Sequence, residues 1–145
     1  MKPKLLLRIA AVLMFLHTIG HSFGAFSSKK APNAAVAAVI KGMETTHFDF
    51  MGRSVTLASF DDGFAFIMIL TLLFISILLW LLSAETGNSL SSRLVPLVAV
   101  LLLSMGILEY IYFFPFAAAF SLIAGLCTLI SLFTKDANGK PVLNT

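Results

Sequence analysis

Two histidines and one glutamate lie within stretches of this chain that are otherwise almost entirely apolar. His17 and His21 are four residues apart, so both side chains project from one face of a helix. Glu109 lies in a different apolar stretch. Ionisable side chains inside a membrane are costly and are usually functional. These three residues are therefore the first candidates for a site.

Several kinds of chemistry suit this set. Two imidazoles and a carboxylate are a known ligand pattern for a divalent metal, which would make His17, His21 and Glu109 metal ligands. The same groups can pass protons, because histidine titrates near neutral pH. They can also supply acid–base catalysis to a lipophilic substrate that enters from the bilayer. A purely structural interpretation is a buried hydrogen bond between helices, which contributes only about 1 kcal/mol in membranes.

Four apolar runs surround these residues. They cover residues 5–26, 63–83, 94–114 and 116–133, and each is close to the roughly 20 residues that a helix needs to cross a bilayer. Hydrophobic residues make up 59% of the chain and charged residues 12%, and the mean hydropathy is +0.97. This pattern predicts an all-α fold, a four-helix transmembrane bundle that forms a single membrane domain over residues 1–145. Pro115 is expected in the first turn of the last span.

The positions of the candidate residues along their runs are similar. With a helical rise of about 1.5 Å per residue, His17 lies about 18 Å and His21 about 24 Å from Leu5. Glu109 lies about 22 Å from Leu94 on the same scale. If both runs start at the inner surface, Glu109 falls between the two histidines in height. We therefore expect the three side chains to meet in the outer half of the bundle.

The distribution of Lys and Arg predicts the orientation. Six basic residues fall at the N-terminus, between the second and third runs, and after the fourth, whereas four are spread over residues 27–62. By the positive-inside rule both termini are cytoplasmic, and residues 27–62 form an extracytoplasmic loop. The expected location is the inner (plasma) membrane. The basic start also resembles a secretory signal peptide, but Arg8 interrupts the apolar stretch, and we expect the segment to be retained as a span.

The long loop is predicted to contain a short helix over Ala34–Met43. Its apolar residues follow the i, i+3, i+4, i+7 spacing of an amphipathic helix: Val36, Val39, Ile40 and Met43. Such a helix would lie on the outer membrane surface or cover the bundle. Farther along, Ser59 and Asp62 are predicted to form a capping box that opens the second span.

Other polar residues are weaker candidates for binding. Tyr112 is three residues after Glu109 and shares its helix face. His47 and Arg53 lie in the long loop, where Arg53 is expected to pair with a nearby aspartate. The segment 47–52 interleaves Phe and Met with His47 and Asp49, and we expect it to pack onto the mouth of the bundle, above His17 and His21, since exposed apolar groups need cover.

A glycine pattern lies beside the histidines. Gly20 and Gly24 form G-x-x-x-G, and small residues at this spacing let another helix approach closely in a membrane. We therefore expect this helix face to point into the bundle.

Part of the chain resembles a known group of proteins. The string FDFMGRSVTLASFDDGFAF at residues 48–66, together with HTIGH at residues 17–21, resembles a group of small bacterial four-helix integral membrane proteins of uncharacterised function. The shared features are a Met-Gly beside an Arg-Ser pair and a Phe-x-x-Gly-Phe that enters the second helix. The layout is also similar, more distantly, to the DoxX-type four-helix proteins. These resemblances imply a membrane architecture and no catalytic residue, because shared architecture is not shared function.

Three functions remain open. The first is a binding protein or a proton or metal relay that uses the polar site, with a divalent metal as its candidate cofactor. The second is a membrane enzyme or oxidoreductase subunit that acts on a lipid or quinone. The third is an accessory protein that packs on a larger membrane partner. Expected partners are membrane lipids, with a lipophilic small molecule or another membrane protein as alternatives. A nucleic acid is not expected, because the net charge is only +3 and the basic residues are scattered.

Overall fold

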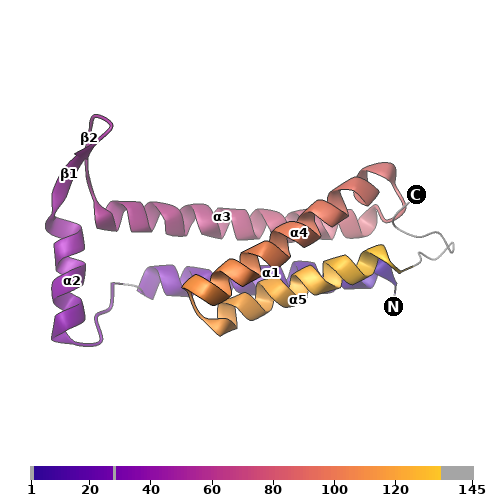
Figure 1. Cartoon of the computed structure of the whole chain (residues 1–145), viewed down its shortest axis with the longest axis horizontal. Coiled ribbons are helices and arrows are strands. Elements are labelled where there is room, and N and C mark those ends of the chain that lie inside the picture. The colour runs from indigo at the N-terminus through magenta and orange to yellow at the C-terminus, as the bar shows by residue number, and fades with distance from the viewer. Residues whose placement is uncertain (1, 28, 135–145) are drawn as a thin grey trace. The chain divides into compact units, whose positions relative to one another are not determined.

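The structure, a computed structural model, describes residues 2–27 and 29–134. In this part of the chain there are five helices and one β-hairpin (Figure 1). In chain order the elements are α1 (Pro3–Ser27), α2 (Ala34–Thr45), β1 (His47–Phe50), β2 (Arg53–Thr56), α3 (Leu57–Ala84), α4 (Ser89–Tyr112) and α5 (Pro115–Leu132). The helices α1, α3, α4 and α5 are long and apolar enough to cross a membrane. The predicted four long apolar helices and the helix in the loop are therefore confirmed, whereas the all-α prediction missed the hairpin.

The chain divides into two compact units. The first unit contains the residues up to Thr18 and those from Leu72 onward. The second unit is Ile19–Thr71. The single membrane domain expected over residues 1–145 stays a prediction, and each unit has its own internal packing.

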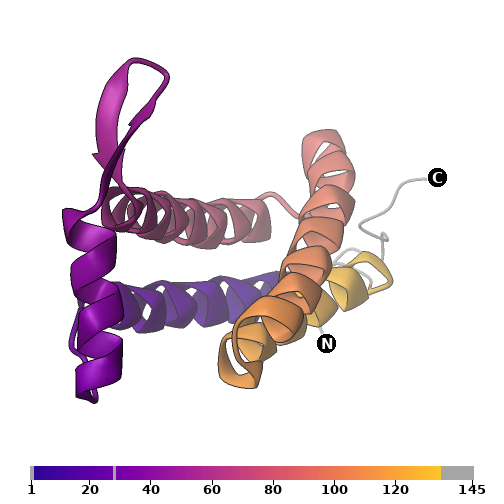
Figure 2. The same cartoon turned by 60° about the vertical axis from the view of Figure 1, so that its left-hand side comes forward.

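In the first unit, α4 and α5 form an antiparallel hairpin and lie side by side in both views (Figures 1 and 2). Asn88 caps the start of α4 by accepting a hydrogen bond from the backbone N–H of Leu90 at 3.2 Å. As predicted from sequence, Pro115 occupies the first turn of α5, where its missing N–H leaves no broken hydrogen bond. The turn between the two helices is only two residues long, Phe113 and Phe114.

Two glycines set how closely α4 and α5 approach. A Cβ atom added at Gly106 would lie 2.6 Å from Leu122 Cγ, and one added at Gly125 would lie 2.9 Å from Leu103 Cδ2. Each glycine thus receives a leucine of the opposite helix. The expected close approach at Gly20 and Gly24 is not found in this way, because an added Cβ at either would meet no other described atom within 4 Å.

Hydroxyl groups occupy much of the interior of this unit. Ser121, Thr128 and Ser131 on α5 are fully buried. Thr128 and Ser131 donate to backbone carbonyls of their own helix, at 2.8 and 2.6 Å. Between helices, Ser76 of α3 donates to the carbonyl of Ala11 in α1 at 2.8 Å. Small polar side chains therefore bring the helices together here, as they commonly do in membrane proteins.

In the second unit, α2 begins where its sequence predicts. Asn33 is its N-cap and accepts a hydrogen bond from the N–H of Val36 at 2.9 Å. Within this unit α2 runs across the helical segments that end at Ser27 and begin at Leu57 (Figures 1 and 2). None of its residues is buried, and Val39 is 63% exposed. The apolar face of α2 is therefore only partly covered by the described part of the chain, since Ile40 and Met43 are half-buried and Val36 and Val39 are exposed.

The hairpin β1–β2 follows α2 and was not predicted. Its strands pair antiparallel, with His47 opposite Thr56 and Phe50 opposite Arg53. The two-residue turn, Met51–Gly52, has positive φ angles of 50° and 80°, which match the turn type that suits the twist of a hairpin.

Aromatic rings attach the hairpin to the start of α3. Phe48 stacks on Phe60 with ring centroids 6.1 Å apart, and Phe50 meets the same ring edge-on at 5.5 Å. The aromatic residues of this segment thus pack on Phe60 of α3, and the expected packing on the mouth of the bundle stays a prediction. Met51 differs from that expectation, because it lies at the tip of the turn and is 90% exposed.

The start of α3 corrects two expectations. The helix begins at Leu57, because the Thr56 hydroxyl accepts from the N–H of Ser59 while the Ser59 hydroxyl accepts from the N–H of Thr56. Ser59 is thus the third helical residue of a capping box whose N-cap is Thr56, and it does not pair with Asp62. Among the described residues, Asp62 instead forms an ion pair of 2.7 Å with Lys29 rather than with Arg53. This hydrogen bond raises the pKa of the Lys29 ammonium above its usual value.

The glycine contacts predict the effect of one added methyl group. Gly106→Ala should destabilise the protein by about 1–3 kcal/mol, the usual cost of overpacking, because both the Leu122 side chain and its backbone nitrogen lie within about 3 Å of the new carbon. The free energy of unfolding in mixed detergent micelles measures this. Gly24→Ala is the matched control, since its added carbon meets open space. Equal stability of the two variants would contradict the assigned contact.

The exposed apolar face of α2 predicts where this helix resides. Spin labels at Val39 and Met43 should be accessible to membrane-dissolved oxygen and shielded from a water-soluble relaxation agent. A label at Lys41 should show the opposite behaviour, because this residue lies on the polar face. Equal accessibility at the three positions in reconstituted vesicles would show that α2 is not an interfacial helix.

Candidate functional site

Three helices of the first unit meet around the ring of His17. This residue lies in α1 at the end of a buried stripe that includes Leu7, Ala10 and Met14, so its ring is directed inward. Glu109 lies in the last turn of α4, and Ser121 lies in the second turn of α5.

The structure brings His17 and Glu109 together. His17 Nε2 is 3.6 Å from Glu109 Oε1, and the two residues are only 5% and 8% exposed. This distance is within ion-pair range and longer than a short hydrogen bond. The approach agrees with the similar positions expected from the two apolar runs.

The rest of the imidazole also has close neighbours. His17 Nδ1 lies 3.3 Å from the hydroxyl oxygen of Ser121. One face of the ring stacks on Phe120, with centroids 5.8 Å apart, and Phe120 in turn meets Phe116 edge-on at 5.2 Å. The ring is therefore oriented through both nitrogens and one face, which fixes which nitrogen is directed toward Glu109.

The carboxyl group of Glu109 is only partly satisfied. Its second oxygen, Oε2, is buried and has no hydrogen-bond partner among the described atoms. An unsatisfied buried polar atom usually costs about 1–3 kcal/mol.

The charge of the pair depends on one proton. An imidazolium with a carboxylate and a neutral imidazole with a protonated carboxyl each contain one titratable proton and carry no net charge. Adding a second proton or removing the first leaves an uncompensated charge in an apolar interior, which is costly. The geometry of His17 and Glu109 therefore suits one proton shared between two groups.

The other sequence candidates do not join this pair in the first unit. His21 belongs to the second unit, where it is half-buried and its Nε2 has no hydrogen-bond partner among the described atoms. His47 and Arg53 belong to the hairpin and are exposed. Tyr112 ends α4 and is 75% exposed, so it extends away from the buried carboxyl. The convergence of His21 with His17 and Glu109 stays a prediction.

The metal interpretation finds no complete ligand set. Within the residues that the structure describes, no group of three or more His, Cys, Asp or Glu side chains is close enough to hold a metal ion. His17 and Glu109 by themselves supply two ligands, fewer than the three or four protein ligands of typical zinc sites.

Ser121 and Phe120 were missed by the sequence analysis. The sequence carries a signal for one of them. Ser121 and Thr128 are seven residues apart in the last apolar run, a helical spacing that places both on one face. This polar stripe indicates the buried side of α5, although it does not identify His17 as the neighbour.

None of the protein-family models, curated proteins or solved structures compared with this chain matches it. The resemblance to small bacterial four-helix membrane proteins therefore stays a prediction.

The contact between His17 and Glu109 predicts an energetic coupling. In a double-mutant cycle of His17→Gln and Glu109→Gln, the two changes should be non-additive by about 1 kcal/mol, the size typical of polar contacts between membrane helices. Unfolding in mixed micelles supplies the free energies.

A cycle of His17→Gln with Glu85→Gln is the control. Glu85 follows the end of α3 in the same unit and is exposed, so the two changes should be additive. A coupling indistinguishable from zero in both cycles would show that the His17–Glu109 contact does not form.

Proposed function

We propose that this chain is a multi-pass protein of the bacterial plasma membrane that binds and transfers protons at the His17–Glu109 pair. The four long apolar helices support membrane insertion. The Lys and Arg distribution supports cytoplasmic termini, because basic residues accumulate on the cytoplasmic side.

The exposed part of α2 supports a location at the membrane surface. An amphipathic helix with exposed apolar residues such as Val39 suits the membrane interface, where these residues are buried in lipid. The side of the membrane follows from the basic residues alone: with cytoplasmic termini, α2 and the hairpin belong to the extracytoplasmic side. The crossing of α2 over its neighbouring helical segments (Figure 1) suits a helix that lies along a surface.

The observation that carries the proposal is the buried pair at 3.6 Å. Acidic residues and histidines in membrane helices commonly form proton relays. His17 can hold a proton at Nε2 and Glu109 at either carboxyl oxygen, and one transfer between them leaves the net charge of the pair unchanged. Such a step needs only these two groups.

Polar groups continue on both sides of the pair. Glu109 is only three residues from the end of α4, so it lies about 5 Å along the helix axis from the interhelical turn. On the other side, Ser121 contacts His17, and Thr128 and Ser131 continue along the buried side of α5. A hydroxyl group can both donate and accept a hydrogen bond, which is the property that a proton path requires. Ser121 meets this requirement beside His17, whereas Thr128 and Ser131 already donate to backbone carbonyls of α5.

The remaining functions are less well supported by the described residues. A metal relay would need a third ligand beside His17 and Glu109, and His21 is the candidate that the sequence offers. A membrane enzyme and an accessory protein stay predictions. Proton transfer needs only the two groups that lie together, and for this reason it is preferred.

The proposal predicts a proton flux through the purified protein. In vesicles with a potassium diffusion potential and an internal pH-sensitive dye, the pH of the lumen should change faster when the wild-type chain is present than in empty vesicles. The sign of the potential sets the direction of the change. Glu109→Gln should reduce the flux to the level of empty vesicles, because an amide cannot exchange a proton at this pH. His17→Gln should do the same, and Ser121→Ala should lower the flux partially.

The control variant is Glu85→Gln, which removes an equal charge from an exposed position and should leave the flux unchanged. Unaltered flux in Glu109→Gln would refute the proposal. Metal analysis of the same preparations tests the alternative directly, since a stoichiometric divalent metal that is lost in both His17→Gln and Glu109→Gln would favour a metal site.

A further inference from the structure

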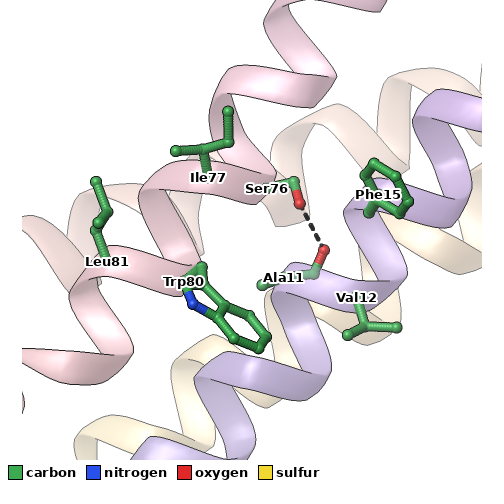
Figure 3. Close-up of a pocket in the computed structure, with 7 residues that line it drawn as sticks. All are labelled: Ala11, Val12, Phe15, Ser76, Ile77, Trp80 and Leu81. Carbon is green, nitrogen blue, oxygen red and sulfur yellow. Dashed lines mark hydrogen bonds between the residues drawn. The ribbon is translucent and has the colours of Figure 1, made fainter.

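A shallow groove runs between α1 and α3 in the first unit. It has a volume of about 290 Å³. Figure 3 shows the indole of Trp80 beside Ala11 and Val12 of α1, close to the hydrogen bond from Ser76 to the Ala11 carbonyl. Phe15 borders it farther along α1. The volume is at the lower limit for a small-molecule pocket, and it suits a narrow chain better than a bulky ligand.

The lining requires an apolar occupant. Its residues are aliphatic or aromatic apart from Ser76. The hydroxyl of Ser76 already donates to Ala11, at 2.8 Å, so it does not need a partner from a ligand. A polar ligand would leave its own hydrogen-bonding groups unsatisfied against these walls. A hydrocarbon chain has no such groups and therefore fits the lining.

One end of the groove is cationic. The guanidinium carbon of Arg8 lies 5.0 Å from the centre of the Trp80 ring, over its face. Lys4 lies one helical turn earlier on the same face of α1. Both side chains are exposed, and within the described residues neither forms an ion pair with a carboxylate.

The contact with Trp80 leaves Arg8 able to bind an anion. The exposed guanidinium forms no ion pair with another described residue, and its five N–H groups form a fork that matches phosphate oxygens. Arg8 can therefore rest on the indole and bind a phosphate at the same time.

The cationic end also lies at the level of lipid headgroups. α1 begins at Pro3, so Arg8 lies only about 8 Å along the helix axis. Trp80 lies about 6 Å from the end of α3 at Ala84. Tryptophan at this depth is typical of the membrane interface, and basic residues there attract anionic lipids.

We infer that this groove is a binding site for an anionic phospholipid, with one acyl chain against Trp80, Val12 and Phe15 and the phosphate at Arg8 and Lys4. The charge at one end selects the occupant, since a zwitterionic lipid has an ammonium that the two cations repel. The site is separate from the His17–Glu109 pair, and the inference does not depend on proton transfer.

The chain provides its own probe for a test, because Trp80 is its single tryptophan. The full-length protein is reconstituted into vesicles that contain phosphatidylglycerol or phosphatidylcholine brominated on one acyl chain, in a background of unlabelled phosphatidylcholine. Bromine quenches an indole that it contacts. Brominated phosphatidylglycerol should quench Trp80 with an apparent affinity at least about fivefold higher than brominated phosphatidylcholine, because one basic residue near the surface accounts for a factor of about five and the site has two.

Three comparisons make the result specific. Arg8→Gln should reduce the preference for phosphatidylglycerol strongly, because Arg8 is the cation that contacts Trp80, and Lys4→Gln should reduce it less. Arg93→Gln removes the same charge from an exposed position near the start of α4 and should preserve it. In the wild type, raising the salt concentration should weaken the preference, since exposed charges are screened.

Equal quenching of Trp80 by the two lipids would overturn the inference, and so would a preference that is undiminished in Arg8→Gln. Weak quenching by both lipids, together with crosslinking between copies of Ile77→Cys made in a Cys127→Ser background, would show that the groove is covered by a second copy of the chain instead. Because Arg8→Gln can perturb the packing on Trp80, the salt series in the unmodified protein stands as an independent measure.

Discussion

The close contact of α4 with α5 determines where the polar groups of the first unit lie. Gly106 receives Leu122, and Gly125 receives Leu103, so the two helices can slide past each other only by breaking both contacts. Glu109 follows Gly106 by three residues, and Ser121 directly precedes Leu122. The register that the glycines impose therefore brings a carboxyl and a hydroxyl to the same end of the hairpin, where both meet the His17 ring.

The interaction of His17 with Glu109 is a poor means of holding helices together. Polar contacts in membrane proteins contribute little on average, and apolar side chains of similar volume often replace a buried ion pair without loss of stability. The α4–α5 hairpin already has its glycine contacts and buried hydroxyls. A titratable pair in this position adds cost to the fold, which is a further reason for the proposal that the pair exchanges a proton.

The four long helices could be predicted because each corresponds to an apolar run that is long enough to cross a bilayer. The same holds for α2, whose cap at Asn33 and helical spacing are local signals. The approach of His17 to Glu109 could be predicted from their similar distances along the two runs. The hairpin could not be predicted, since its four-residue strands are short and its turn carries Met51 where Asn or Asp is usual.

Other features depend on which helices and strands pack against one another, and a local sequence pattern does not indicate these partners. Gly20 and Gly24 have the familiar spacing, yet the tight contacts involve two glycines on different helices, Gly106 and Gly125. Ser121 acquires its role only because α5 brings it to His17. The capping of α3 by Thr56 rather than Ser59 depends on where β2 ends, which the apolar run that follows does not indicate.

The turn at Met51 has a chemical consequence of its own. Its side chain is 90% exposed at the tip of the hairpin, whereas Met14 is fully enclosed in the first unit. An oxidant dissolved in water reaches the first thioether and not the second, so Met51 would be converted to the sulfoxide ahead of Met14. That change replaces a flexible apolar group with a polar one next to Phe50, whose ring contacts Phe60. The hairpin thus carries a thioether that can be oxidised reversibly to the sulfoxide, while the enclosed Met14 stays reduced.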